Sequence, residues 1–197
     1  MRVRLSTALA AVLVFLTGCG GGQDPRPPSR TAANGDVFNS ADVRFASDMV
    51  VHHAQALQLI DMLREHASSG ALQDLGERLL DQQPPQTEQM VDWLSDWDQE
   101  LPETPMDHTN ADDNGGMLLT GDEMPGLLSS DEVGELEKLT GTAFARRWAE
   151  LMAEQQQGAV DMAATETDRG MFKPALKLAA AVADQHANTV ELLETFN

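Results

Sequence analysis

Two adjacent histidines, His52 and His53, stand within an otherwise apolar helical stripe, and Met49 precedes them by one turn. Side chains three or four positions apart share a helix face, so Met49 can approach one ion together with either imidazole. Thioether sulfur and imidazole nitrogen are ligands that suit Cu(I). The two histidines differ by about 100° around the helix axis, so both reach one ion only if it lies between helices. The alternative is an ordinary core, in which Gln82 or Gln86 hydrogen-bonds a histidine and methionine fills space.

The composition excludes some partners and some ligands. The chain of 197 residues carries 13 basic and 32 acidic residues, a formal net charge of −19. Nucleic-acid binding requires a basic face, so we expect no nucleic-acid partner. The single cysteine stands at position 19. We therefore expect no disulfide, and a metal site must use histidine, methionine, carboxylate or amide groups rather than thiolate.

The first residues resemble a bacterial lipoprotein signal. A basic segment, residues 1–4, precedes the apolar residues 5–16, and Leu16-Thr17-Gly18-Cys19 follows. The apolar stretch is shorter than the roughly 20 residues that span a bilayer. We predict that residues 1–18 are removed and that Cys19 becomes the lipidated first residue, with a plain signal peptide or a buried apolar helix as alternatives. Residues 19–38, rich in glycine, proline and polar residues, are predicted to be a flexible tether.

Four segments carry core candidates at steps of three and four, the spacing of helices packed in a bundle. In a first hairpin, at about 40–98, the stripes are Phe45, Met49, His52, Ala56, Leu59, Leu63, and then Leu72, Leu75, Leu79, Gln82, Gln86, Met90, Trp93, Trp97. In a second hairpin, at about 142–196, they are Phe144, Trp148, Met152, Gln155, Ala159, Met162, and then Leu178, Val182, Gln185, Thr189, Leu192, Phe196. Pro84 and Pro85 fall inside the second segment, where we expect a kink or break.

The two hairpins are an internal repeat. Aligning residues 49–56 with residues 152–159 pairs Met49 with Met152 and sets the two histidines over Gln155 and Gln156. A linker at about 99–129 and a short helix at about 131–140 join the hairpins, and a capping-box sequence at 129–132 precedes that helix. A duplicated helical hairpin predicts an all-α four-helix bundle with one long crossover over residues 39–197.

The motifs in these helices resemble the bacterial "domain of unknown function 305" family. They are Phe45…Met49-x-x-His52-His53-Ala54-Gln55-Ala56, Met90-x-x-Trp93-Leu94-x-x-Trp97 and Met124-Pro125-Gly126-Leu127-Leu128-Ser129. The resemblance covers roughly residues 40–197 and implies a ferritin-like four-helix fold and export. Some members resemble periplasmic copper-binding proteins with Met and His ligands. Family members commonly carry a second His pair where this chain has Gln155 and Gln156, which implies that half of the site is degraded.

The candidate copper site draws on both repeats. Its predicted ligands are Met49, His52, His53, Met90 and Met152, with Met162 as a weaker candidate. Asp48, four residues before His52, is predicted to orient the His52 ring, and Gln86 and Gln155 to complete the surroundings. Counting outward from the turn near residue 69 places Gln86 and Met90 in one layer with Met49 and His52.

Three further groups are predicted to lie outside the site. His66 is expected at an exposed helix end, and His186 on the flank of the last helix beside Gln185. The linker residues Met106, His108 and Met117 either capture metal loosely or belong to a solvated acidic loop.

The remaining patterns favour binding over catalysis. A di-iron oxidase needs Glu-x-x-His on two helices, but the residues three before the five histidines are Met49, Val50, Leu63, Pro105 and Ala183. A haem held by Met and His without covalent attachment stays an alternative. No acid–base pair or phosphate loop stands out, so we do not expect an enzyme.

We therefore expect an exported protein of the bacterial cell envelope, held to the membrane by lipidated Cys19, that binds or sequesters copper. The alternative, favoured by Gln155 and Gln156, is a non-catalytic surface or adaptor lipoprotein that has lost metal binding. The sequence indicates no protein partner.

Overall fold

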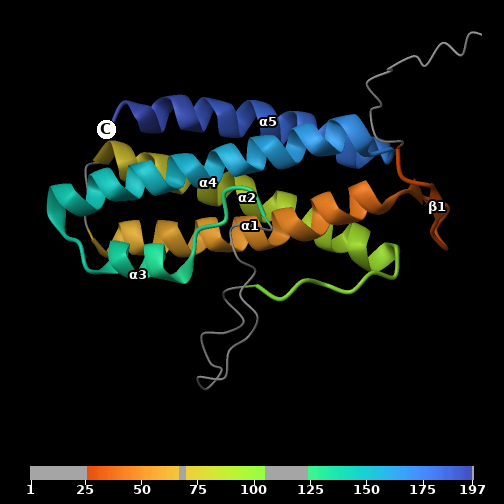
Figure 1. Ribbon diagram of the computed structural model, residues 1–197, viewed down its shortest axis with the longest axis horizontal. Helices are drawn as coiled ribbons and strands as arrows, with labels where there is room; N and C mark the ends of the chain where they lie inside the picture. The colour runs from red at the N-terminus through yellow and green to blue at the C-terminus, as the bar shows by residue number, and fades with distance from the viewer. Residues whose placement is uncertain (1–25, 67–69, 105–123, 197) are drawn as a thin grey trace, which may run out of the picture.

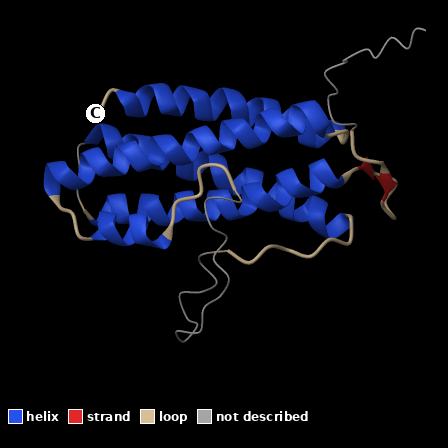
Figure 2. Cartoon of the chain, in the orientation of Figure 1, coloured by secondary structure: helices blue, strands red, loops and turns tan. Residues whose placement is uncertain are grey.

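The long helices pair as the two hairpins that the repeat predicts. The structure, a computed structural model, describes residues 26–66, 70–104 and 124–196. Its elements are β1 (Arg30–Thr31), β2 (Val37–Phe38), α1 (Ser40–Glu65), α2 (Gly70–Asp96), α3 (Ser130–Glu137), α4 (Gly141–Arg169) and α5 (Lys173–Glu194). The helices α1 and α2 form one antiparallel pair, and α4 and α5 form the other. The two pairs contact each other where α1 packs against α4 (Figure 1). Helices make up most of the described fold (Figure 2). The all-α, ferritin-like four-helix bundle is confirmed.

The stripes predicted for α1 and α4 are buried throughout, and those of α2 and α5 are buried in large part, with single positions shifted by one residue. Gln83 is buried and Gln82 is exposed. In α5 the buried residues are Ala175, Leu178, Ala179, Val182, His186, Thr189 and Leu193. The prediction that His186 lies on a flank was therefore wrong, because its side chain is 2% exposed. Adjacent polar residues occupy the middle of both stripes, so hydrophobicity alone does not fix the rotation of these helices.

α2 runs from Gly70 to Asp96 without interruption, although Pro84 and Pro85 lie inside it. The prolines lack the amide donors that would bond to the carbonyls of Leu80 and Asp81. Both prolines and Asp81 are exposed and Leu80 is half-buried, so water can reach the freed carbonyls. Of the predicted kink or break, the break was wrong, because the lost hydrogen bonds fall on the solvent side of the helix.

Residues 26–38 pack on one end of the bundle. β1 and β2 pair antiparallel, and Phe38, 1% exposed, stacks on Trp97 with ring centroids 4.5 Å apart. Arg26 donates a hydrogen bond to the backbone oxygen of Asp168 at 2.9 Å. The prediction of a flexible tether at 19–38 was thus wrong for residues 26–38, because the burial of Phe38 anchors a stretch that its polar composition marked as loose.

Asp42 fastens the start of α1 to the turn between α4 and α5. One oxygen of its carboxylate accepts from the backbone N–H of Asn39, the residue that caps α1, at 2.6 Å. The other oxygen accepts from the N–H groups of Met171 and Phe172, both at 2.9 Å. A single buried carboxylate therefore ties the two hairpins together.

Glu166, 1% exposed, is a second buried carboxyl group beside Asp42. Burial, reinforced by the hydrogen bond to Asp42 and by its charge, raises the pKa of Glu166 to about 9. At neutral pH Glu166 is therefore protonated and donates to Asp42. Gly170 makes room for it, since a Cβ at that position would overlap the Glu166 carboxyl group.

The segment from Met124 to Leu128 crosses α1 and α4. Gln55 of α1 holds it by two hydrogen bonds, from its amide nitrogen to the oxygen of Leu128 at 2.8 Å and from the N–H of Leu128 to its amide oxygen at 2.9 Å. Gly126, with a φ of 73°, rests directly on Gly158 of α4, and a Cβ on either glycine would overlap the backbone of the other segment. The two glycines allow this close crossing.

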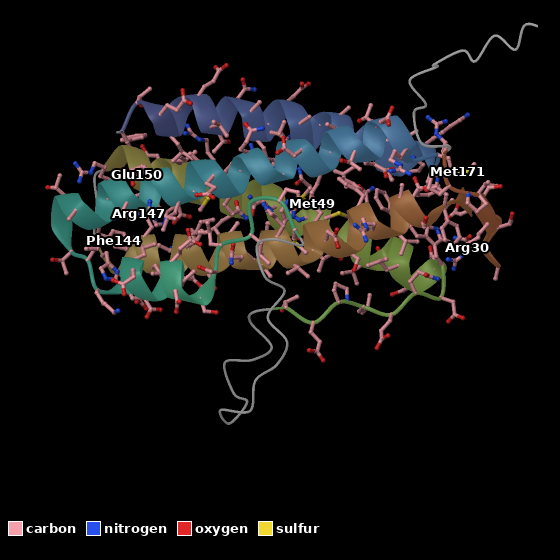
Figure 3. All side chains as sticks on the ribbon, in the orientation of Figure 1. Arg30, Met49, Phe144, Arg147, Glu150 and Met171 are labelled. Carbon is pink, nitrogen blue, oxygen red and sulfur yellow. The ribbon has the colours of Figure 1, made fainter. Side chains whose placement is uncertain are left out.

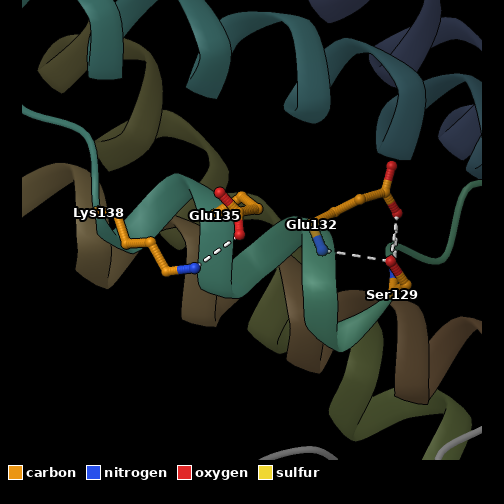
Figure 4. Close-up of polar contacts among 4 residues, drawn as sticks. All are labelled: Ser129, Glu132, Glu135 and Lys138. Atoms are coloured by element: carbon orange, nitrogen blue, oxygen red, sulfur yellow. Dashed lines mark hydrogen bonds and ion pairs between the residues drawn. The ribbon is translucent and has the colours of Figure 1, made fainter.

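α3 begins directly after this crossing. The Ser129 hydroxyl accepts from the N–H of Glu132 at 3.3 Å, and the Glu132 carboxylate accepts from the N–H of Ser129 at 2.9 Å (Figure 4). This is the capping box that the sequence predicts. Lys138 forms an exposed ion pair with Glu135 just after the helix (Figure 4). None of the helices in the described ranges is long and apolar enough to cross a membrane.

Candidate metal centre

His52 is held at both ring nitrogens by Gln155. Its Nε2–H donates to the Gln155 backbone oxygen at 2.7 Å, and its Nδ1 accepts from the Gln155 amide nitrogen at 3.0 Å. The same amide nitrogen donates to the His52 backbone oxygen at 2.8 Å. Burial lowers the pKa of His52 to about 3. Gln155 therefore orients the ring that Asp48 was predicted to orient, and His52 has no free ring nitrogen for a metal.

Met152 belongs to the same amide network. Gln156 donates from its amide nitrogen to the Gln155 amide oxygen at 2.7 Å and approaches the Met152 sulfur at 3.4 Å. All of these side chains are fully buried. The glutamine pair in the second repeat thus engages His52 and Met152, two of the predicted ligands.

His53 differs from His52 in having one free nitrogen. The Thr87 hydroxyl donates to the Gln83 backbone oxygen at 3.1 Å, so it accepts from His53 Nδ1–H, also at 3.1 Å. His53 Nε2 is then a bare acceptor, buried and without a hydrogen-bond partner among the described residues. Burial, with the charges of His186 and His52, keeps the pKa of His53 well below its usual value. The Nε2 lone pair is therefore available at neutral pH.

His186 of α5 lies against His53. Their rings stack with centroids 5.8 Å apart and planes within 8°. Burial lowers the pKa of His186 to about 4, and its Nδ1 has no hydrogen-bond partner within the described ranges. His186 is absent from the predicted ligands, although the spacing of Val182, His186 and Thr189 places it on the buried face.

Met49 and Met90 belong to one core cluster. Met49 precedes His53 by one turn and Met90 follows Thr87 by three residues, and both are fully buried in a cluster that also contains Val182 and Met162. Figure 3 places Met49 near the middle of the bundle's length. Met152 packs in the other core cluster. The structure therefore buries Met49, one turn before His53, in the same core cluster as Met90, whereas His52 and Met152 join the amide network.

Asp48 and Met162 line a cavity elsewhere in the fold. The cavity measures about 390 Å³, lies between α1 and α4, and is also lined by Arg44 and Glu166. Burial raises the pKa of Asp48, and Arg44 opposes that shift. Met162 therefore lines this cavity as well as belonging to the core cluster that contains Met49 and Met90.

Two glutamines of α2, Gln83 and Gln86, are buried in the bundle. Gln86 donates to the Gln185 amide oxygen at 2.8 Å, which links α2 to α5. The amide oxygens of Gln86 and Gln83 are buried and lack a partner in the described part of the chain. A groove of about 260 Å³ between α2 and α5 is lined by Gln82, Gln185 and Leu75, among others.

These donors fit a soft metal ion better than a hard one. Within residues 26–66, 70–104 and 124–196, no three His, Cys, Asp or Glu side chains stand close enough to hold a metal. The available groups are imidazole nitrogen and thioether sulfur, which suit Cu(I), rather than the oxygen cages of Mg²⁺ or Ca²⁺. The linker residues Met106, His108 and Met117 lie outside the described residues.

Several solved structures resemble this chain. A DUF305 protein from Streptomyces coelicolor is 26% identical, with a TM-score of 0.65 over 78% of this chain and 89% of that one. A DUF305 fragment from Deinococcus radiodurans is 24% identical, with a TM-score of 0.67 over 84% and 97%. CopM in its Cu(II)-bound form is 19% identical, with a TM-score of 0.63 over 79% and 94%.

The family follows from the sequence itself. No curated protein matches the chain. The family model for a domain of unknown function, DUF305, matches residues 42–197, which is most of the chain and includes both hairpins. The protein therefore belongs to the DUF305 family.

Proposed function

We propose that this protein is an exported, lipid-anchored member of the DUF305 family that binds copper in the core of its bundle and sequesters it. The observation that carries the proposal is the bare Nε2 of His53, fully buried and without a partner in the described residues, on the helix face that also presents Met49. CopM, whose fold this chain shares, has been seen with Cu(I) and with Cu(II) bound, which supports the proposal.

Burial makes the free nitrogen of His53 costly unless something binds it. A buried acceptor without a partner costs about 1–3 kcal/mol. Metal binding would satisfy it, and because the pKa of His53 lies well below its usual value, protons do not compete at neutral pH. Met49 and Met90 would supply thioether sulfur from α1 and α2. The proposed ligands are thus Met49, His53 and Met90, without His52 and Met152 of the predicted set.

The titration that tests this proposal compares single histidine variants. His53→Gln is expected to weaken Cu(I) affinity by about a hundredfold, because an amide replaces the free imidazole nitrogen. His52→Gln is the matched control and should retain the wild-type affinity, because Gln155 already occupies both nitrogens of that ring. Cu(I) competition against a chromophoric chelator measures both. A wild-type protein that binds no stoichiometric copper would contradict the proposal.

The same titration separates a second candidate function. The amide network around His52 supports a surface or adaptor lipoprotein that no longer binds metal, because Gln155 and Gln156 engage two of the ligands that the repeat predicts. That candidate requires wild type and His53→Gln to show the same weak copper binding. In either case we propose a binding role and no catalysis.

The anchor is tested at Cys19, which lies outside the described residues. Cys19→Ala is expected to move the exported protein from the membrane fraction to the soluble fraction, because each buried methylene of an acyl chain contributes about 0.8 kcal/mol to membrane binding. Fractionation of expressing bacteria, with labelling by an alkyne fatty acid, measures this. Unchanged membrane association with no label on the wild type would exclude lipidation at this cysteine. The Streptomyces coelicolor relative, provisionally described as secreted, supports export.

A further inference from the structure

We infer that His53 and His186 form a buried two-histidine site that takes a monovalent soft cation, Cu(I) or Ag(I), in preference to a divalent ion. The inference rests on the proposed function, since it assumes that the bundle core binds metal. It adds a ligand, His186, from the last helix of the second hairpin, and it states which ionic charge the site accepts.

The geometry brings together the two histidines that keep a free nitrogen. Their rings lie 5.8 Å apart and nearly parallel. His53 and His186 are 0% and 2% exposed. Of the histidines in the described ranges, these are the two with a buried ring nitrogen that lacks a partner, Nε2 in His53 and Nδ1 in His186. One ion between α1 and α5 would satisfy both nitrogens and join the two hairpins.

The neutral surroundings of His53 and His186 favour a monovalent ion over a divalent one. The neighbours of the two histidines along their own helices and on α2 are neutral: Met49 and Val182 stand one turn before each histidine, and Thr87 is hydrogen-bonded to His53. No acidic group joins the two histidines to make a three-residue metal cluster in the part of the chain that the structure describes. Within the described ranges, no carboxylate therefore stands with the two histidines to balance the charge of a bound ion.

The cost of burying an ion rises with the square of its charge, so a divalent ion in this neutral setting is far more costly than a monovalent one. The amide oxygens of Gln83 and Gln86, buried and without partners among the described residues, supply partial negative charge but no full charge. Imidazole and thioether ligands bind Cu(I) and its redox-stable analogue Ag(I) without a counter-charge.

The experiment uses the full-length protein with Ag(I) and Zn(II) as probes. Wild type is expected to bind one equivalent of Ag(I), and Zn(II) about a hundredfold more weakly. His186→Gln should lose about tenfold or more in Ag(I) affinity. His66→Gln is the matched control and should lose nothing, because the His66 ring stacks on Phe144 at the end of α1 and its Nδ1 already contacts the Met62 backbone oxygen.

A second readout needs no variant. In ¹⁵N-labelled wild type, Ag(I) is expected to shift the resonances of His53 Nε2 and His186 Nδ1 and to leave both nitrogens of His52 in place. Copper binding by wild type with an unchanged His186→Gln would overturn this inference and leave the proposed function standing. If Zn(II) bound as tightly as Ag(I) does, the inferred preference for a monovalent ion would be overturned. A wild type that binds neither copper nor silver would overturn both proposals.

Discussion

Replacing Gly158 by alanine is expected to destabilise the protein by about 3 kcal/mol, the upper end of the usual cost of overpacking. This change in the free energy of unfolding is opposite in sign to the effect of helix propensity, which favours alanine over glycine inside a helix by about 1 kcal/mol. The reason is the crossing segment, because a Cβ on Gly158 would overlap the backbone of Pro125 and Gly126. Backbone cannot rotate away as a side chain can. Urea unfolding followed by circular dichroism measures the change.

Gly134→Ala is the matched control for this prediction. Gly134 lies inside α3, and a Cβ there would meet nothing within 4 Å. This variant should be more stable than wild type by up to about 1 kcal/mol. If Gly158→Ala were also stabilising, the crossing of Met124–Leu128 over α4 would be wrong.

Replacing Glu166 by glutamine is expected to stabilise the protein by about 3 kcal/mol at pH 7, since each pKa unit corresponds to about 1.4 kcal/mol. The pKa of Glu166 is raised to about 9 from an ordinary value of 4.5. The fold therefore keeps this proton while the unfolded chain releases it. The stability linked to the proton is fully present below pH 4.5 and is lost as the pH rises through 9. Glutamine stays neutral and can still donate to Asp42.

The pH dependence distinguishes this effect from better packing. The stability difference between Glu166→Gln and wild type should be small at pH 4.5, grow up to about pH 9 and then level off. Glu154→Gln, which removes an exposed carboxylate from the same helix, should change stability by no more than about 0.5 kcal/mol. A difference that stays constant between pH 5 and 9 would mean that Glu166 is ionised in the fold.

The sequence predicts the bundle because two of its four stripes are unambiguous. In α1 and α4, large apolar residues such as Phe45, Leu63 and Trp148 repeat at both ends of the stripe, and all of them are buried. Only one rotation of each helix buries such a set. The repeat of these helices, each followed by a partner after a short turn, then determines the antiparallel pairs.

The sequence does not predict the structure where polar residues or long-range contacts determine which side chain is buried. The choice between Gln82 and Gln83, or between Gln185 and His186, changes little in hydrophobicity but changes which side chain enters the core. Phe38 is one aromatic residue in a polar stretch, and its role depends on Trp97, far away in the sequence.

The candidate site was predicted only in part for a similar reason. The repeat pairs Met49 with Met152 and the histidines with Gln155 and Gln156. It gives no sign that a glutamine amide, longer than an imidazole and able to both donate and accept, would reach across and occupy His52. Which histidine stays free depends on these individual hydrogen bonds, and no spacing pattern encodes them.

The hydrogen bond between the side chains of Gln86 and Gln185 also bears on how readily the contact between α2 and α5 opens. Where α2 meets α5, a groove of about 260 Å³ lies beside this bridge. A neutral hydrogen bond contributes about 1 kcal/mol net, so the bridge opens far more readily than two packed helices separate. It follows that Gln86 and Gln185 can break and re-form their hydrogen bond by side-chain motion beside this groove. The polar contact between α2 and α5 can thus open and close while every helix stays folded.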